Sequence, residues 1–358
     1  MNADVNVLIL AGGSGTRFWP ASRAALPKQL LALSGDVPMI RQTMTRVLPL
    51  LGGPEKVWVA TGRATENATR EMLPELAGDR FLVEPVARNT APCIAWAAEV
   101  IGRRAPNDIV VVLPSDHHVA DEPAFRAVLE AAIGAARTGK IVTLGIRPTR
   151  PDTGFGYIEL EAPCAFDSKN VKPEPVMRFV EKPNKETAEQ FLSAGKYVWN
   201  AGMFIFRASD MMRAVREHLP EATPLMDDLA SCESAILEQA FPKMPSVSID
   251  VGIMEREKGL LVVPGDFGWS DVGSWLAAWE LAEKDADGNT KCAALVNVGS
   301  KNNHVVSLGD HKRVIALLGV EGMAVVDTGD ALLVMPLEKA QEVRAIVDVL
   351  KATRKQLL

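Results

Sequence analysis

The feature that most constrains this chain is an apolar run that ends in a glycine-rich turn close to the N-terminus. The run from Val5 to Leu10 is short and continuous, and Gly12, Gly13 and Gly15 follow it directly. Continuous apolarity indicates a strand covered on both faces, hence a mostly parallel sheet. Glycine lets the backbone approach a bulky anion and point its N–H groups at it. The sequence therefore predicts an α/β fold with a phosphate-binding loop at a strand end.

Two cations follow this turn within a short span. Arg17 and Lys28 place fixed positive charge where the oxygens of a bound phosphate would lie. Position 18 is phenylalanine, so a dinucleotide fingerprint starting at Gly13 is incomplete, and the turn lacks the Gly-Lys-Ser/Thr run of a Walker A loop. A tight turn without a ligand is the alternative for the glycines alone. Together with the two cations, they favour a polyphosphate ligand.

The overall charge indicates a local anion site rather than an extended basic surface. The 358 residues carry a formal net charge of −6, whereas nucleic-acid binding needs a broad basic face. We therefore expect no nucleic-acid partner, and anionic substrates would be captured by Arg17, Arg23 and Lys28. A hydrophobic share of 47% and a charged share of 23% are typical of a globular enzyme. A length of 358 residues predicts one large domain and an appendage.

The cysteines and the N-terminus predict a reducing compartment. The cysteines form no Cys-x-x-Cys pair, which argues against a disulfide framework or a zinc site; they are Cys93, Cys164, Cys232 and Cys292. No basic leader precedes the first strand, and no apolar run approaches membrane-spanning length. We expect a cytoplasmic protein without a membrane partner.

Strand-like and helix-like patterns alternate through the first two-thirds of the chain. The predicted strands are Val5 to Leu10, Lys56 to Ala60, Ile109 to Leu113 and Ile141 to Ile146. The predicted helices include Thr90 to Arg103 and Glu122 to Thr138. This alternation predicts a doubly wound, Rossmann-like domain, whose ligands bind beyond the carboxyl ends of the strands. The glycine turn and Asp116 both follow such ends.

A second, smaller part is predicted after the polar, turn-rich segment Lys284 to Asn289, with the division between residues 284 and 285. Its predicted strands and turns are Val305 to Ser307, Val314 to Leu318, Gly319 to Gly322, Met323 to Val326, Asp327 to Asp330 and Leu332 to Met335. A closing helix begins at about Leu337, and its apolar face comprises Val343, Ile346, Val347, Leu350 and Leu357. That face packs either on the β segment or on a second subunit, which leaves a homodimer open. Recognition of a partner protein by this helix is the weaker alternative.

A series of motifs begins with the run Gly12-Gly13-Ser14-Gly15-Thr16-Arg17, then Trp19-Pro20, Ser22-Arg23 and Pro27-Lys28-Gln29. Further motifs are Glu84 to Pro92, Pro114 to His118, Thr153 to Glu159, Arg178 to Pro183, Trp199 to Phe204 and Phe267 to Trp275. In this order they resemble the sugar-nucleotide pyrophosphorylases, most closely the mannose-1-phosphate guanylyltransferase branch. The resemblance implies a nucleotidyltransferase with its catalytic domain at residues 1–284. It would join GTP to α-D-mannose 1-phosphate, giving GDP-mannose and pyrophosphate, by in-line attack without a covalent intermediate.

By this resemblance, Glu84, Arg88 and Asn89 contact the guanine base. The residues also permit a simpler interpretation, in which Thr90 caps a helix and Pro92 occupies its first turn. The two interpretations are compatible, because a capped helix start holds donors and acceptors rigidly.

The resemblance also implies a sugar site at Gly156, Glu181, Lys182 and Asn200. Glu181 would accept hydrogen bonds from sugar hydroxyls, Lys182 would hold the sugar 1-phosphate, and Asn200 would bind a hydroxyl. Phe155 stands where the family has tyrosine, so a hydroxyl contact is missing there. The alternatives are a glycine bulge at Gly156 and an exposed surface pair of Glu181 and Lys182.

Asp116 and Asp271 are the metal ligands that the resemblance implies. Carboxylate oxygens suit a hard cation, which would be Mg²⁺, with Mn²⁺ as the alternative. The resemblance also allows a contact of Asp116 with the ribose, and Asp116 could instead cap the following helix. His117 and His118 are interpreted as hydrogen-bonding or surface residues, because no softer ligand set lies nearby.

The predicted roles complete the hypothesis. The cations that neutralise phosphate charge are Arg17, Lys28 and Lys182. The substrate-binding residues are Gly12, Gly13, Gly15, Thr16, Glu84, Arg88, Asn89, Gly156, Glu181 and Asn200. The alternative hypotheses are a transferase for another nucleotide or hexose 1-phosphate, and a non-catalytic regulatory paralogue that binds sugar nucleotide. The C-terminal segment is too short for a cupin-type isomerase domain, so we expect no phosphomannose isomerase activity.

Overall fold

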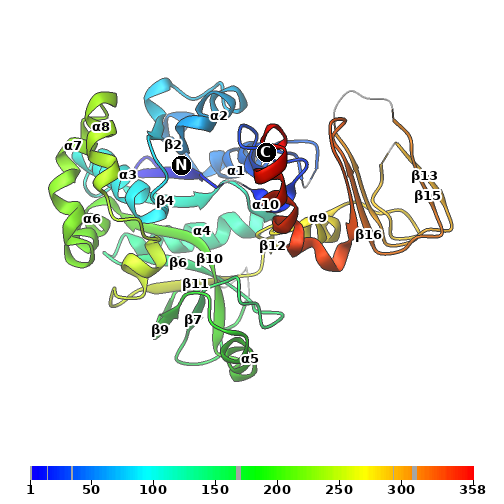
Figure 1. Cartoon of the computed structure of the whole chain (residues 1–358). Helices are drawn as coiled ribbons and strands as arrows, with labels where there is room; N and C mark the ends of the chain where they lie inside the picture. Colours follow the sequence, from blue (N-terminus) through cyan, green and yellow to red (C-terminus); the bar gives the residue numbers. More distant parts are fainter. Residues whose placement is uncertain (1, 14, 34, 167–170, 293, 309–312) are drawn as a thin grey trace.

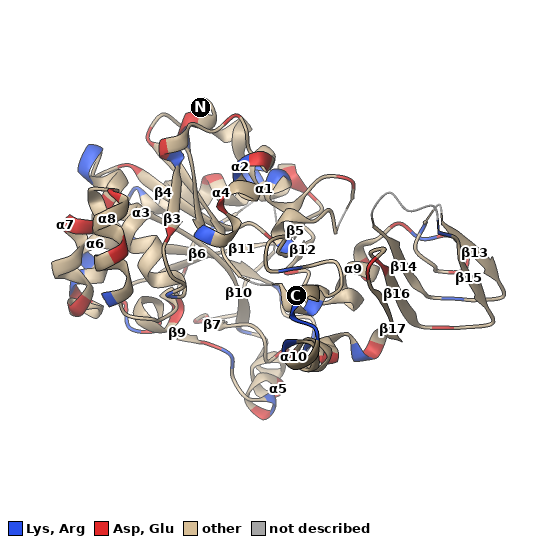
Figure 2. Cartoon of the chain, turned by 45° about the horizontal axis from the view of Figure 1, so that its top comes forward, with Lys and Arg blue, Asp and Glu red and all other residues tan. Residues whose placement is uncertain are grey.

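The chain folds into a large α/β part and a smaller β part, and the C-terminal helix returns from the second to lie beside the first (Figure 1). The computed structural model describes residues 2–13, 15–33, 35–166, 171–292, 294–308 and 313–358. Within these ranges, no helix is both long and apolar enough to cross a membrane. Figure 2 shows Lys and Arg interspersed with Asp and Glu over both parts.

A mixed sheet of ten strands forms the centre of the large part. Its main order is β3-β2-β1-β4-β10-β6-β11-β8, with β7 beside β10 and β9 beside β7. The strands are β1 (Val5–Ala11), β2 (Val57–Gly62), β3 (Phe81–Glu84), β4 (Ile109–Pro114), β6 (Val142–Ile146), β7 (Tyr157–Glu159), β8 (Glu174–Pro175), β9 (Arg178–Val180), β10 (Tyr197–Arg207) and β11 (Leu261–Gly265). The four predicted strands correspond to β1, β2, β4 and β6, and the β3-β2-β1-β4 half is parallel as expected.

The long strand β10 departs from the parallel pattern, because it runs antiparallel to both β4 and β6. Its side chains are buried at nearly every position, so the apolar run alone does not reveal the strand direction. The pairing with β6 shifts register between Asn200 and Phe204, where Gly202 has a positive φ of 66°. This irregularity is typical of a β-bulge, which re-aims the neighbouring side chains.

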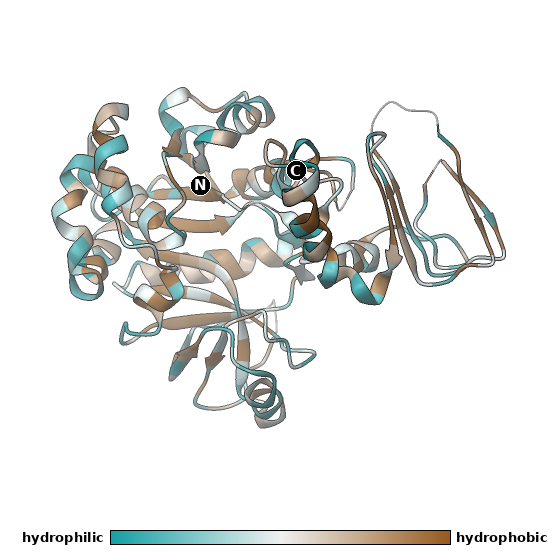
Figure 3. Ribbon diagram, viewed as in Figure 1, coloured by the Kyte–Doolittle hydropathy of each residue, from teal (hydrophilic) through white to brown (hydrophobic). Residues whose placement is uncertain are grey.

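Helices cover both faces of the sheet, as a doubly wound fold requires. The helices of the large part are α1 (Met39–Val47), α2 (Glu66–Met72), α3 (Thr90–Arg104), α4 (Glu122–Ala136), α5 (Lys185–Ala194), α6 (Ala208–His218), α7 (Met226–Ala230) and α8 (Ser234–Ala240). A further helix, α9 (Trp275–Leu281), packs in a third core together with the β part. Ile9 of β1 shares one core with α1 and α4, whereas Leu8 shares the other with α3 and α6. Figure 3 shows the resulting apolar strands between the two helix layers. The two predicted helices correspond to α3 and α4.

The smaller part consists of short strands that pair across successive turns of the chain. They are β13 (Leu295–Val298), β14 (His304–Ser307), β15 (Ile315–Leu318), β16 (Met323–Asp327) and β17 (Leu332–Pro336). β13 pairs in parallel with β15 and β14 with β16, whereas β16 and β17 form an antiparallel hairpin. Four of these strands were predicted, and β13 was missed. The segment Gly319 to Gly322 joins two different sheets and is therefore a corner, not a hairpin turn.

The closing helix α10 (Val343–Thr353) follows a short 3-10 segment, Leu337–Glu342. Val343 and Val347 belong to a core that includes Ala324 and Val326 of the β part, as expected. The same core also contains Phe18, Trp19 and Trp275, so the helix packs on the large part as well. The sequence analysis named only the β segment or a second subunit as packing partners of this helix and missed the large part. The predicted division at residues 284 and 285 stays a prediction.

Candidate functional site

Two adjoining cavities open beyond the carboxyl ends of β1 and β4. Their volumes are about 580 Å³ and about 290 Å³, and Asp116, His117 and Asp271 line both. The other predicted residues at the larger cavity are Gly12, Gly13, Glu84, Arg88, Asn89, Gly156, Glu181, Lys182 and Asn200. Those at the smaller cavity are Gly15, Thr16, Arg17 and Lys28. Of the residues predicted to bind substrate or metal, all but Arg23 therefore line one of these two cavities.

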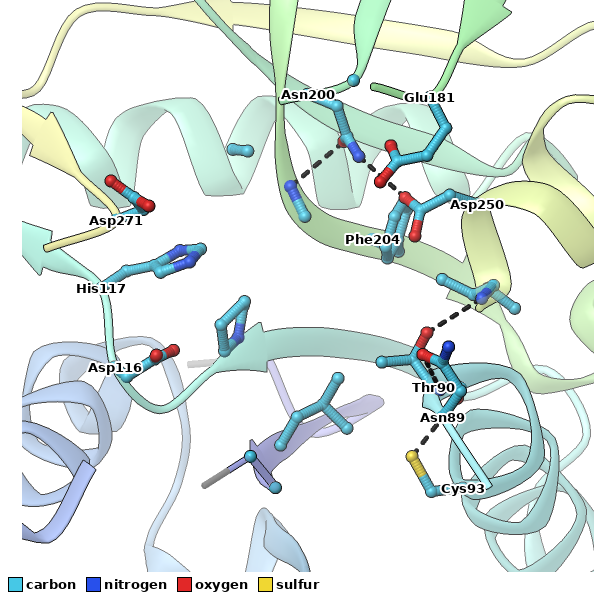
Figure 4. A pocket seen from close by; sticks show the side chains of 18 of the residues that line it. Asn89, Thr90, Cys93, Asp116, His117, Glu181, Asn200, Phe204, Asp250 and Asp271 are labelled. Atoms are coloured by element: carbon cyan, nitrogen blue, oxygen red, sulfur yellow. Dashed lines mark hydrogen bonds between the residues drawn. The ribbon is translucent and has the colours of Figure 1, made fainter. Parts of the chain in front are cut away.

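Figure 4 shows three separate groups of side chains around the larger cavity. The acidic group is Asp116, His117 and Asp271. The amide group is Glu181, Asn200 and Asp250. The helix group, at the start of α3, is Asn89, Thr90 and Cys93. The cavity therefore offers polar partners to a ligand at three places.

Lys28 lies where the glycine turn meets the acidic group. Its Nζ atom donates to Asp116 Oδ2 at 2.8 Å and to the carbonyl oxygen of Asp271 at 2.6 Å. A Cβ at Gly15 would lie 2.7 Å from Lys28 Cβ, and Gly15 has a positive φ of 56°. Only glycine allows this close approach of the two backbones. An ammonium group has three donors, so one remains for a ligand oxygen.

Arg17 projects into the smaller cavity from a 3-10 turn, Thr16–Phe18. Its Nη1 atom donates to the carbonyl of Gly273 at 3.4 Å. Burial, and then the charge of Arg344, lower the pKa of Arg17. Arg23, by contrast, was wrongly expected to capture the substrate. It pairs with Asp330 of the β part at 3.1 Å and so connects the two parts instead.

The two carboxylates of the acidic group have opposite pKa shifts. Burial would raise the pKa of Asp116, but the charges of Lys28 and His117 and the hydrogen bond from Lys28 outweigh it and lower that pKa. Burial, together with the charge of Asp116, raises the pKa of Asp271 against the opposing charge of Lys28. Two carboxylates that face one cavity and repel each other would be stabilised by a hard cation between them. This donor set fits a divalent metal ion.

The two histidines of this segment differ, because His117 has a hydrogen-bond partner whereas the buried Nδ1 atom of His118 has none among the described residues. His117 Nδ1 accepts a hydrogen bond from Trp269 Nε1 at 3.2 Å, and burial lowers the pKa of His117 to about 4. The hydrogen-bonding interpretation of His117 agrees with this contact. Asp116 is not a helix cap, because Asp121 caps α4. Elsewhere in the described ranges, a triad of Glu217, His218 and Glu257 could reach a metal ion, but Glu257 pairs with Arg213.

The helix group is held by the cap of α3. Asn89 is the N-cap residue, and its side chain accepts from the backbone N–H of Thr90 at 2.9 Å. The predicted cap at Thr90 was therefore wrong by one residue, because the Thr90 hydroxyl accepts from the backbone N–H of Ile249 instead. Asn89 has a positive φ of 66°, which turns the chain sharply before the helix. The carboxamide N–H groups of Asn89 remain at the cavity.

Glu84 ends β3 beside the helix group. Its Oε1 atom is buried and has no hydrogen-bond partner in the described part of the chain, and burial raises the pKa of Glu84 to about 7. A buried acceptor without a partner costs free energy of folding, so a ligand that donates a hydrogen bond to it would gain binding free energy. Arg88 donates through Nη2 to the carbonyl of Pro242, which ties its guanidinium to the backbone.

Asn200 is the centre of the amide group. Its Oδ1 atom accepts from the Thr143 hydroxyl at 2.9 Å and from the Gly202 backbone N–H at 3.1 Å. Its Nδ2 atom donates to Asp250 Oδ1 at 2.9 Å. Burial, and then the charge of Glu181, raise the pKa of Asp250 to about 6. Asn200 is thereby fixed in one orientation, and Asp250 is held beside it.

Glu181 and Lys182 follow β9 and reach the same cavity. Lys182 has a positive φ of 45°, and its Nζ lies 2.7 Å from Glu181 Oε1. In a regular strand the side chains of Glu181 and Lys182 would point to opposite faces. The positive φ at Lys182 ends the strand geometry, so both side chains can lie on the same side. A Cβ at Gly156 would lie 2.7 Å from Glu181 Oε2, so a larger residue there would displace the end of the Glu181 side chain. The exposed-pair alternative fits Lys182, at 61% exposure, but not Glu181, at 15%.

Phe155 belongs to an aromatic wall rather than to a set of hydrogen-bond donors. Its ring packs on Trp199 and Trp269, with centroids 4.9 Å and 5.4 Å away. The phenyl ring in place of a phenol thus fills this wall without a polar atom.

The structure also adds two residues that the sequence analysis missed. Asp250 begins a short π-helical segment, Asp250–Met254, and Arg344 reaches the smaller cavity from α10. No strand end or glycine turn precedes either residue, so neither has the local signal that identified the others.

Comparison with known proteins assigns both parts of the chain. Residues 6–288 match the family model described as Nucleotidyl transferase, and residues 294–350 match a MannoseP isomerase/GMP-like beta-helix domain. The second match agrees with the parallel pairing of short strands in the smaller part.

Relatives of this chain match over nearly its full length. Xanthan biosynthesis protein XanB of Xanthomonas campestris pv. campestris (strain B100) is 38% identical, covering 98% of this chain and 74% of that protein. Mannose-1-phosphate guanylyltransferase of Escherichia coli (strain K12) is 38% identical, covering 96% and 73%. A crystal structure from Thermus thermophilus, named mannose-1-phosphate geranyltransferase, is 35% identical with a TM-score of 0.85, covering 97% and 99%.

Proposed function

The chain belongs to the nucleotidyl transferase family, and we propose that it transfers GMP from GTP to α-D-mannose 1-phosphate, giving GDP-mannose and pyrophosphate. The name of its Escherichia coli relative, mannose-1-phosphate guanylyltransferase, supports this substrate pair. The name of the Thermus thermophilus protein supports the sugar phosphate alone. The observation that carries the proposal is the division of the larger cavity into the helix, amide and acidic groups. A nucleotide base, a sugar and the reacting phosphates need three such places.

The helix group and Glu84 suit a base that donates hydrogen bonds. Guanine presents an exocyclic N–H₂ donor, which adenine lacks at the same edge. The buried Oε1 atom of Glu84 can accept from it, while Asn89 supplies amide N–H groups beside it. A site with an acceptor left unpaired discriminates strongly against a base without the donor.

The amide group suits a sugar ring with neighbouring hydroxyls. Asp250 and Glu181 provide acceptors, and the fixed carboxamide of Asn200 sets the position of Asp250. Lys182 lies beside them with an exposed ammonium group that can bind the sugar 1-phosphate. Gly156 lies beside Glu181 and has no side chain, so its backbone is open to the sugar ring.

The chemistry follows from the charges between these places. The sugar-phosphate oxygen is already anionic, so its in-line attack on the α-phosphorus needs no general base. Arg17, Lys28 and Lys182 hold the phosphates and neutralise charge as pyrophosphate leaves. Asp116 and Asp271 would hold a divalent ion, for which we propose Mg²⁺; when bound, it neutralises and orients the phosphate oxygens.

The test measures pyrophosphate release by the purified protein with Mg²⁺, mannose 1-phosphate and each nucleoside triphosphate in turn. We expect release with GTP that a chelator abolishes. Strong release with another nucleotide would contradict the guanine assignment, and release with glucose 1-phosphate at an equal rate would contradict the sugar assignment. Absence of release with every pair would favour a regulatory, binding-only protein.

A further inference from the structure

The C-terminal helix is docked on the turn that carries Arg17. Val343 and Val347 of α10 share a core with Phe18 and Trp19, which flank the end of that turn. The indole Nε1 atom of Trp19 donates to the carbonyl of Leu357 at 2.9 Å, close to the chain end. The helix therefore has a fixed position relative to the glycine turn, although more than 300 residues of chain separate them.

This docking brings Arg344 to the site. Arg344 follows Val343 and lines the smaller cavity together with Arg17 and Lys28. Its side chain is exposed toward solvent, and in the part of the chain that the structure describes no carboxylate pairs with it. Three cationic side chains from two distant segments thus face one cavity.

The electrostatics of this cavity favour an anion with more than one charge. The charge of Arg344, next after burial, lowers the pKa of Arg17, so the two guanidinium groups repel each other. The carboxylate of Asp116 is already paired with Lys28. The charges of Asp271 and Asp152 raise the pKa of Arg17, but each acts more weakly than the charge of Arg344. An anion that bridges two guanidinium groups would remove this repulsion and gain charge-assisted hydrogen bonds.

We propose that Arg344 binds the β- and γ-phosphates of the nucleoside triphosphate and the pyrophosphate that leaves, so that the C-terminal helix completes the active site. This inference rests on the proposed function. The larger cavity already offers places for the base, the sugar and the α-phosphate. The smaller cavity adjoins it at Asp116 and Asp271, which is where the leaving pyrophosphate would extend.

The kinetic test compares Arg344→Ala with Arg344→Lys. Alanine favours the helix, so α10 keeps its fold, and lysine keeps the charge. As matched control, Lys351→Ala removes a cation of the same helix that pairs with Asp348. We expect Arg344→Ala to raise the KM for GTP and, in the reverse reaction, for pyrophosphate about tenfold. The KM for mannose 1-phosphate and for GDP-mannose should change less than twofold.

A structural role of Arg344 would give a different pattern. Equal changes in the KM of all four substrates, or a lower kcat with every KM unchanged, would overturn the proposal, as would wild-type kinetics in Arg344→Ala. Arg344→Lys should recover most of the affinity, and Lys351→Ala should match the wild type.

Equilibrium binding of inorganic pyrophosphate with Mg²⁺, measured by calorimetry, separates this inference from the proposed function. If the wild type has no transferase activity but binds pyrophosphate, and Arg344→Ala binds it about tenfold more weakly, then the anion site stands and only the reaction is wrong. Equal pyrophosphate affinity in both proteins would overturn the role of Arg344 even if the transferase activity is present.

Discussion

Lys28 and Asp271 both line the smaller cavity but affect the stability of the fold differently. Lys28 is a buried cation paired with Asp116, whereas no hydrogen bond to the Asp271 carboxylate occurs among the described residues. Burial raises the pKa of Asp271, which means that its charge costs stability in the folded protein. Substitution of either residue should therefore lower activity, but only substitution of Lys28 should lower stability.

We predict that Asp271→Asn lowers turnover on the order of a hundredfold and leaves the melting temperature equal or higher. Lys28→Ala should lose similar activity and also about 1–3 kcal/mol of stability, because it leaves Asp116 without its cation. Initial rates and thermal melts measure both effects. Asp266→Asn changes an exposed carboxylate shortly before Asp271 and serves as the control. Equal destabilisation by both active-site variants would contradict this separation.

Glu84 gives a prediction about pH. Burial raises its pKa from 4.5 to about 7, so between these values the folded state binds more protons than the unfolded state. The stability contributed by this group therefore falls as pH rises from 4.5 to 7, by about 3 kcal/mol at most. We expect Glu84→Gln to raise the melting temperature at pH 8 and to leave it nearly unchanged at pH 4.5.

The same substitution should weaken substrate binding. Glutamine loses the carboxylate that would accept from guanine, so the KM for GTP should rise at pH 8 on the order of tenfold. In the wild type this KM should rise as pH falls below about 7, and Glu84→Gln should lose that dependence. An unchanged melting temperature at pH 8, or a KM that keeps its pH dependence in the variant, would count against the role of Glu84.

At the scale of elements, the start of α3 serves both the fold and the site. Asn89 caps the helix and has a positive φ of 66°, a conformation that alanine adopts with strain. We predict that Asn89→Ala costs roughly 1–3 kcal/mol, because it loses the cap and adds strain. Asn89→Gly should cost only a few tenths of a kcal/mol, since glycine tolerates the backbone.

Chemical denaturation of the two Asn89 variants measures this difference. Both variants lose the carboxamide at the cavity, so both should raise the KM for GTP by the same factor. A larger rise in the alanine variant would mean that the helix start, rather than the side chain, sets the affinity.

At the scale of the whole molecule, Trp275 couples the two parts. It is fully buried, its Nε1 atom donates to the carbonyl of Trp19 at 3.1 Å, and its ring lies 4.9 Å from Phe18 and 5.7 Å from His304. These contacts join the glycine turn, α9 and the β part in one core. The two parts should therefore unfold together.

We predict a single calorimetric transition for the wild type. Trp275→Ala should cost about 3–5 kcal/mol and separate a transition of the β part from that of the α/β part. Trp279→Ala removes a half-buried indole from the same helix and should keep one transition. If Trp275→Ala also melts in one step at the wild-type temperature, this core does not couple the parts.

Some residues of the site could be predicted because their signals are local. Gly15 has the left-handed backbone that only glycine adopts easily, and Asp116 follows a wholly apolar strand. Parallel strands bring their carboxyl ends to one edge of a sheet, so residues after β1 and β4 had to meet. The motif order then identified residues such as Asn200, whose own surroundings carry no such signal.

The remaining features depend on contacts between distant segments. The direction of β10 was not readable, because a strand buried on both faces has the same pattern in either direction. Asp250 belongs to the amide group because the fold places it within hydrogen-bond distance of Asn200. Arg23 pairs with Asp330 of the β part instead of lining the cavities.

The sequence by itself determined the glycine turn after β1, the strands and helices around it and the position of Asp116 after β4, because these follow from backbone conformation and short-range periodicity. The resemblance of the motifs to a family, not periodicity, implied residues such as Glu84 and Asn200. Only the tertiary structure decided that α10 docks on the turn of Arg17 and brings Arg344 to the smaller cavity. An apolar helix face predicts that the helix will be buried, but not against which surface. That choice depends on the complementary shape of Phe18, Trp19 and Trp275, which exists only after the chain has folded.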